Sequence, residues 1–173
     1  MVHEKVKTMK IIDVARKYIG QKELAGNKFD DNTELGKRLH AAGQKDGEAW
    51  CSYFGEAVCT ESYPDKAKDI QKLFSASAVA TFKNFVAADY TVVTVPMLGA
   101  LVIWRRYENG KPMWQGHFGI VTEVTANGFK SVEGNSNAQG SRDSDSVIEN
   151  VRTEKYSPNG LTIMGFIILG FET

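Results

Sequence analysis

The spacing of apolar residues predicts helices in the first half of the chain. Ile11, Ile12, Ala15, Tyr18 and Ile19 recur close to every 3.6 residues, which is typical of a helix with one buried face over residues 10–21. Polar residues that commonly begin helices stand near several later starts, such as Asn32 or Thr33. Further helices are therefore expected over residues 32–42, 51–59, 65–74 and 77–87.

From Tyr90 onward the pattern changes to runs rich in β-branched and aromatic residues, which are typical of strands. Turn signals that contain Asn-Gly separate these runs at residues 108–110, 126–128 and 157–160. Helices followed by such a series predict an α+β fold, in which N-terminal helices pack on a C-terminal antiparallel β-meander. The expected strands cover residues 99–105, 114–124, 129–133, 147–153 and 161–171.

The length of 173 residues and the absence of a linker predict a polar tail over residues 1–9 and a single domain over residues 10–173. The formal net charge of +0 gives no basic surface for nucleic acid or for an anionic membrane. Charges recur every few residues at the N-terminus, and no stretch is apolar enough to span a membrane. The chain is therefore expected to be soluble and made in the cytoplasm without a signal peptide.

The two cysteines differ in their expected surroundings. Cys51 and Cys59 lie eight residues apart in one predicted helix, about 12 Å along its axis, which is too far for a disulfide. Cys51 stands at the start of that helix, where free backbone N–H groups and the helix dipole favour a thiolate. Cys59 lies in the middle of the helix among apolar residues and is expected to be a small buried side chain.

Three histidines are candidates for a general base. His3 lies in the polar tail, and His40 lies on a predicted helix beside Arg38. His117 begins a strand between Gly116 and a further glycine two residues later, so that other groups can approach it closely. Cys51 as nucleophile and His117 as its base, adjacent in space but distant in sequence, are the layout expected of a cysteine hydrolase.

The turn at residues 126–128 predicts which residues share a face with His117. With a three-residue loop and Gly128 in the left-handed conformation, Thr125 faces Phe129; a two-residue loop gives a poorer pattern. The core face then holds Phe118, Ile120, Val124 and Val132. The opposite face holds His117 with Glu133, Asn135 and Asn137, and the register does not choose among these three as the group that orients the imidazole.

Three motifs in this order resemble the CHAP amidase/peptidase family, which is allied to the NlpC/P60 and papain-like cysteine hydrolases. They are Trp50-Cys51-Ser-Tyr-Phe54, Gly116-His117-Phe-Gly-Ile-Val121 and Glu133-Gly-Asn135. Segments 19–26 and 96–104 are also similar, so the resemblance covers about residues 10 to 171. One departure is Ala100, where the family commonly has an acidic residue.

The resemblance implies a papain-like fold with the nucleophile at a helix N-terminus, and hydrolysis of an amide bond in peptidoglycan. It places Cys51, His117, Glu133 and Asn135 in the catalytic site. The backbone N–H of Cys51 is expected to stabilise the oxyanion, with Gln44 as a candidate second donor. The four residues Trp50, Tyr53, Trp104 and Trp114 are candidates for lining a substrate groove.

Several alternatives stay open at this stage. The bond is either the N-acetylmuramoyl-L-alanine amide or a stem or cross-bridge peptide, and the setting is a phage endolysin or an interbacterial amidase toxin that reaches the wall after release. A non-catalytic wall-binding or structural module is the rival reading. Peptidoglycan is the only expected partner, and a monomer is expected. No cofactor is expected; segments 27–32 and 143–145 are candidate calcium loops, although ordinary turns are favoured.

Overall fold

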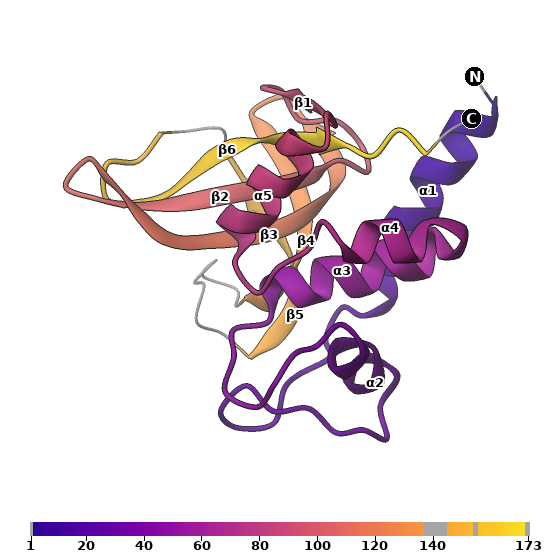
Figure 1. The fold of residues 1–173 in the computed structure, drawn as a ribbon. Coiled ribbons are helices and arrows are strands. Elements are labelled where there is room, and N and C mark those ends of the chain that lie inside the picture. Colours follow the sequence, from indigo (N-terminus) through magenta and orange to yellow (C-terminus); the bar gives the residue numbers. More distant parts are fainter. Residues whose placement is uncertain (1, 137–144, 154–155, 172–173) are drawn as a thin grey trace.

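The computed structural model describes residues 2–136, 145–153 and 156–171, with side chains from residue 10 onward. Figure 1 shows the helices below and beside a twisted sheet. Helix α3 begins at Cys51, as the sequence predicts, and α1 runs back to Val2 through the predicted polar tail. Thr33 and Ser77 cap α2 and α5 by accepting hydrogen bonds from Gly36 N and Ala80 N. The helices are α1 (Val2–Lys17), α2 (Glu34–Ala41), α3 (Cys51–Ser62), α4 (Ala67–Gln71), α5 (Ala78–Ala87) and the short 3₁₀ helix η1 (Pro64–Lys66).

In the part of the chain that the structure describes, six strands form one sheet in which every neighbouring pair is antiparallel. The strands are β1 (Thr91–Val93), β2 (Leu101–Glu108), β3 (Lys111–Thr125), β4 (Gly128–Ser136), β5 (Ser146–Arg152) and β6 (Gly160–Ile168). Their order across the sheet is β1-β6-β2-β3-β4-β5. The molecule is therefore a mixed α+β fold.

The predicted papain-like arrangement, with N-terminal helices on a C-terminal antiparallel β-meander, is wrong. The strands β2 to β5 follow one another, but β6 returns across the sheet and pairs with β2, and the short β1 pairs with β6. Turn signals report only on strands that are neighbours in sequence. The place of β6 depends on long-range burial of residues such as Phe166 and Ile167, which no local pattern encodes.

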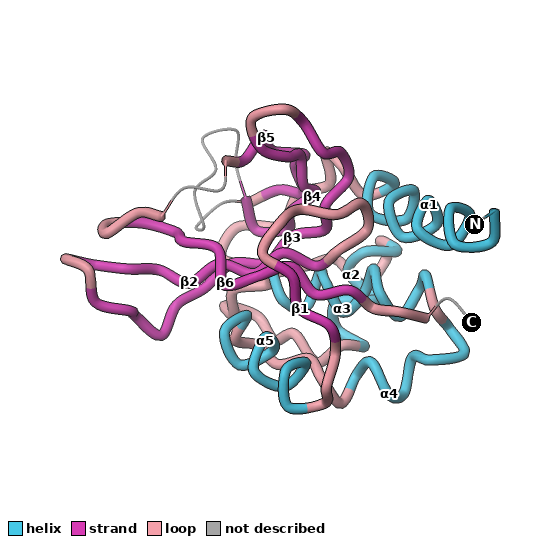
Figure 2. The backbone as a smooth tube through the Cα atoms, turned by 90° about the horizontal axis from the view of Figure 1, so that it is seen from above, coloured by secondary structure: helices cyan, strands magenta, loops and turns pink. Residues whose placement is uncertain are grey.

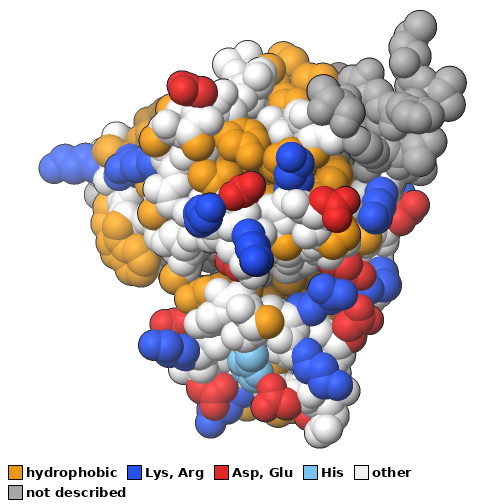
Figure 3. Space-filling model, turned by 45° about the vertical axis from the view of Figure 1, so that its right-hand side comes forward, with side chains coloured by type: hydrophobic (Ala, Val, Ile, Leu, Met, Phe, Trp, Pro, Cys, Tyr) orange, Lys and Arg blue, Asp and Glu red, His pale blue; other side chains and the backbone are white. Residues whose placement is uncertain are grey.

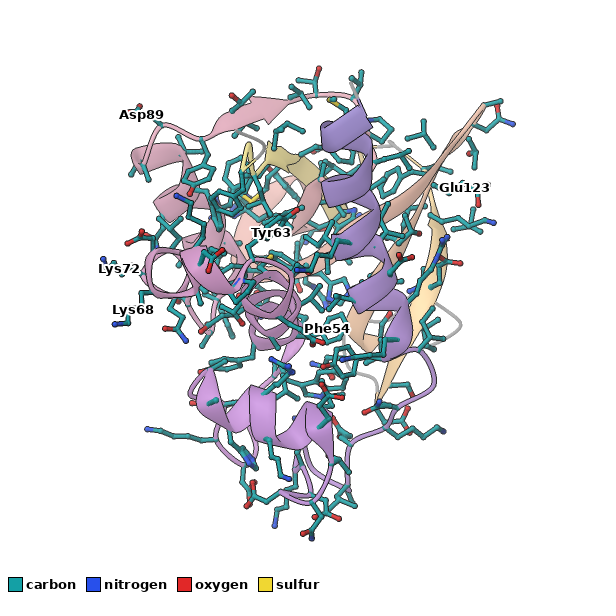
Figure 4. The ribbon with its side chains drawn as sticks, turned by 90° about the vertical axis from the view of Figure 1, so that its right-hand side faces the viewer. Phe54, Tyr63, Lys68, Lys72, Asp89 and Glu123 are labelled. Atoms are coloured by element: carbon teal, nitrogen blue, oxygen red, sulfur yellow. The ribbon has the colours of Figure 1, made fainter. Side chains whose placement is uncertain are left out.

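Both faces of the sheet carry buried apolar side chains. Helices α3 and α5 cover one face, where α3 packs on β3 and β4 and α5 packs on β2 and β3 (Figures 1 and 2). In Figure 4, Phe54 of α3 lies in the interior, whereas Lys68, Lys72 and Asp89 lie at the periphery. The opposite face carries a second apolar cluster, in which Trp104 stacks on Phe129 at a centroid distance of 6.2 Å.

The face of the molecule in Figure 3 carries acidic and basic side chains intermixed, with apolar side chains between them. This agrees with the balanced charge of the chain. Within the described residues, no helix is long and apolar enough to cross a membrane.

Candidate active site

Cys51 is the first residue of α3 and is 4% exposed. The preceding residue, Trp50, has φ −119° and ψ 12° and makes no side-chain capping hydrogen bond to the helix. The backbone N–H groups of the first turn are therefore not occupied by a cap at Trp50. The thiol thus lies at the positive end of the helix dipole, where an anion is stabilised.

Two glycines let α3 approach the sheet closely enough to bring Cys51 to the strands. A Cβ at Gly134 of β4 would lie 2.7 Å from both Phe54 Cβ and Trp50 Cζ3. A Cβ at Gly55 of α3 would lie 2.2 Å from the ring of Phe118. Only glycine fits at either position, so the helix start is held against β3 and β4.

His117 and Glu133 form the best-defined contact of the site. Nε2 of His117 lies 2.8 Å from Oε2 of Glu133, and both side chains are 0% exposed. A Cβ at Gly119 would lie 3.0 Å from Glu133 Cγ. The glycine that follows His117 by two residues therefore makes room for the carboxylate that contacts the imidazole.

Cys51 acts on the same imidazole. Burial by itself lowers the pKa of His117, but interactions with the Cys51 thiol and the Glu133 carboxylate raise it to about 9. Nε2 is used by Glu133, and the buried Nδ1 makes no hydrogen bond within the described residues. Nδ1 is therefore the ring nitrogen open to a thiol at the start of α3. The chain thus brings together a thiol, an imidazole and a carboxylate from α3, β3 and β4.

Glu133 is held by several donors besides His117. Its Oε1 accepts hydrogen bonds from Arg152 Nε at 2.8 Å and Ser131 Oγ at 2.7 Å, and Arg152 Nη2 contacts Oε2. Asn150 Nδ2 and Ser136 Oγ also donate to Oε2, at 3.1 and 3.3 Å. Burial raises the pKa of Glu133, but Arg152 and His117 outweigh it and lower the pKa to about 2. The carboxylate is therefore ionised at any physiological pH.

Sequence reasoning missed Arg152, Asn150 and Ser131 as members of the site. The signal was present in β5 and β4: Asn150 pairs with Ser131, and Arg152 pairs with Phe129, on the face that carries Glu133. Trp104 also belongs to the surroundings, because its ring lies 5.7 Å from that of His117 and 5.1 Å from the Arg152 guanidinium carbon. Finding these residues required the register of β4 with β5, which no turn signal gave.

The predicted β3–β4 register is wrong in detail. Thr125 pairs with Gly128 rather than Phe129, so the loop contains two residues. A bulge at Thr122 then adds a second one-residue shift, and Ile120 pairs with Val132. Val124, predicted for the core face, is 47% exposed. The two shifts add up to two residues. Because side chains alternate between the faces of a strand, His117 and Glu133 remain on one side.

The other predicted site residues have different outcomes. Asn135 is 2% exposed and has a left-handed φ of 52°, but within the described residues no hydrogen bond joins it to His117. Asn137 lies outside the described residues. Gln44 donates from Nε2 to the backbone oxygens of Asn27 and Lys45, at 3.0 and 2.7 Å. This amide therefore links two loop segments and is not a free donor for the site.

Most of the aromatic candidates for a substrate groove are core residues. Trp50 is 0% exposed and donates from Nε1 to Glu23 Oε2 at 2.5 Å, and Trp104 and Tyr53 are also buried. Trp114, in contrast, is 72% exposed. Cys59 is fully buried, and burial raises the pKa of its thiol far above the usual range.

No group of three or more His, Cys, Asp or Glu side chains that could hold a metal ion occurs in the part of the chain that the structure describes. In the candidate calcium loop of residues 27–32, Asp30 Oδ1 instead accepts hydrogen bonds from Asn32 N and Nδ2, both at 2.8 Å. His40, on α2, contacts Asp31 Oδ1 at 2.5 Å. Asp143 of the second loop lies outside the described residues.

Comparison of the chain with protein-family models, with curated proteins and with solved structures finds no match.

Proposed function

We propose that this chain is a cysteine hydrolase that cleaves an amide bond of peptidoglycan. The observation that carries the proposal is that His117 contacts Glu133 through Nε2 while Cys51 acts on the same imidazole from the start of α3. A thiol at a helix N-terminus, an imidazole and an ionised carboxylate in this order are the parts of an activated thiol nucleophile.

The arrangement supports acyl transfer in two steps. The Cys51 thiolate attacks the amide carbonyl, and the His117 imidazolium gives its proton to the leaving amine, which releases one product and leaves a thioester on Cys51. A water molecule then attacks the thioester with His117 as base, which frees the carboxylic acid and restores the thiol. Glu133 stays ionised throughout and holds the imidazole through Nε2.

The choice of substrate rests on the resemblance of the Trp50-Cys51, Gly116-His117 and Glu133-Gly-Asn135 motifs to CHAP amidases and peptidases. That resemblance favours the muramoyl-alanine amide or a stem or cross-bridge peptide. A phage lysin is the first setting that we propose and an interbacterial toxin the second. Cys51 N–H is the proposed oxyanion donor, because it lies at the uncapped start of α3.

The test is digestion of purified peptidoglycan from several bacteria, with and without added calcium, followed by mass spectrometry of the released fragments. Wild type and Cys59→Ala are expected to release the same fragments, and Cys51→Ala is expected to release none. The new amino or carboxyl ends would identify the bond. Release by Cys51→Ala, or no release by any of the three proteins, would contradict the proposal and favour a non-catalytic wall-binding module.

A further inference from the structure

We propose that Arg152 is a positioning residue of this site, which acts on His117 by fixing the Glu133 carboxylate. The proposal deepens the proposed function, because it assigns a further residue to the same site. It rests on the contacts of one side chain that comes from β5, which supplies neither the nucleophile nor the base.

Arg152 contacts Glu133 at two points. The guanidinium binds both carboxylate oxygens: Nε donates to Oε1 at 2.8 Å, and Nη2 contacts Oε2. A planar fork on a planar carboxylate fixes both its place and its plane, which a single hydrogen bond does not do. Oε2 is also the atom that contacts His117 Nε2. The plane set by Arg152 therefore sets the direction from which the imidazole is held.

The Arg152 side chain is itself restrained. Its guanidinium carbon lies 5.1 Å from the centre of the Trp104 ring, and the ring of Trp104 lies 5.7 Å from that of His117. The Arg152 side chain is 16% exposed, while Glu133 is 0% exposed. A cation that lies over an aromatic ring and is largely shielded from water has little freedom to leave the carboxylate.

Arg152 also changes the balance of charge around Glu133. Within the described residues, Cys51 from α3 and Glu133 act on His117, and Arg152 from β5 and His117 act on Glu133. A buried carboxylate between two cations is stabilised in its ionised form, whereas burial alone favours the neutral acid. Arg152 therefore also keeps Glu133 from competing for the proton that His117 must carry.

The experiment is an NMR titration of the His117 imidazole in the intact wild-type protein and in Arg152→Gln, Arg152→Lys and Arg106→Gln. Arg106 contacts Glu108 at an exposed site, so Arg106→Gln is the matched control. If Arg152 positions Glu133, Arg152→Gln removes the fork that fixes the plane of the carboxylate, and the pKa of His117 falls by about one unit or more. Arg152→Lys keeps the charge but lacks the fork, and a smaller fall is expected.

Two other results would overturn the proposal. A rise in the pKa of His117 in Arg152→Gln would mean that Arg152 acts only as a nearby positive charge. An unchanged pKa would mean that Arg152 has no effect on the imidazole. The titration needs no substrate, so the outcome is independent of whether the chain cleaves peptidoglycan.

A double-mutant cycle adds a second criterion that tolerates a loss of stability. In a Glu133→Gln background, Arg152→Gln is expected to leave the pKa of His117 within about 0.3 units of that of Glu133→Gln alone, because the path from Arg152 to His117 runs through Glu133. The double variant also removes the unpaired buried cation that Glu133→Gln leaves behind. A further shift in the double variant as large as that in Arg152→Gln alone would exclude a positioning role.

Discussion

At the scale of single residues, the site contains two ion pairs that share Glu133, one with His117 and one with Arg152. His117 lies between Cys51 and Glu133, and Glu133 lies between His117 and Arg152. The His117 and Glu133 side chains are fully buried and Arg152 is largely shielded, so removing Glu133 exposes the cost of burying its neighbours.

The pH dependence of thiol reactivity follows from His117. Its pKa is raised to about 9, so the imidazolium persists through neutral pH and is lost as the pH rises through about 9. Cleavage that needs the imidazolium as acid is expected to fall about tenfold per pH unit above that value. The measurement is kcat/KM from pH 6 to 11; a decline that begins near pH 6.5, the ordinary pKa of histidine, would contradict the arrangement.

Glu133→Gln is expected to destabilise the protein by about 3–5 kcal/mol, because it leaves a buried charged His117 and a largely shielded Arg152 without their counter-ion. Glu149→Gln is the control. It removes a carboxylate that contacts Arg16 at 2.9 Å at a more exposed position, and it is expected to cost about 1 kcal/mol or less. Urea unfolding at pH 7 measures both variants. Equal losses would show that the Glu133 network contributes no more than a surface pair.

At the scale of elements, sequence alone predicted local features and failed on pairing. The start of α3 at Cys51 was predictable, because a polar Gly-containing loop precedes an apolar helical run. The β3–β4 hairpin was also predictable from Asn127-Gly128, but its register was not. The bulge at Thr122 has no signature in the sequence. His117 and Glu133 share the predicted face only because two one-residue errors add up to two residues, after which side chains return to the same face.

The pairing of β6 with β2, and of β4 with β5, depends on contacts between residues far apart in sequence. Arg152 and Asn150 could not be assigned to the site without that register. Asn135 shows the opposite failure, since it lies on β4 where predicted, yet in the described part of the chain it makes no hydrogen bond to His117. The alternation of faces limits which residues can orient the His117 imidazole, and the packed structure shows that Glu133 contacts it.

The position of α3 depends on its close approach to β4 at Gly134. Gly134→Ala would place a Cβ 2.7 Å from Phe54 Cβ, which forces α3 away from the sheet at the end that carries Cys51. A loss of about 1–3 kcal/mol is expected, with slower alkylation of Cys51 at neutral pH. Gly26→Ala is the control: it has open space but a φ of +81°, so it strains the backbone without moving α3. Unchanged alkylation in Gly134→Ala would show that this contact does not position the thiol.

At the scale of the whole molecule, stability as a function of pH integrates the buried charges. Glu133 has its pKa lowered to about 2, so its contribution is complete above the unfolded value near 4.3 and is lost as the pH falls through about 2. The contribution of His117 is complete below its unfolded value near 6.5 and is lost as the pH rises through about 9. These two groups together favour the folded state most strongly between about pH 4 and 7.

Glu56 destabilises the folded state within that pH range. This α3 residue is 6% exposed, and burial raises the pKa of its carboxyl to about 7. Because the unfolded value is near 4.3, its penalty is absent below that pH, grows between about 4.3 and 7, and is complete above 7.

Glu56→Gln is therefore expected to raise the free energy of unfolding by about 2 kcal/mol at pH 8 and to change it by less than about 0.5 kcal/mol at pH 4. Denaturant unfolding of wild type and variant across this range measures the difference. Glu108→Gln, at an exposed position of β2, is the control and should give a flat difference. A stabilisation that is equal at pH 4 and pH 8 would mean that the gain comes from packing and not from the removed charge.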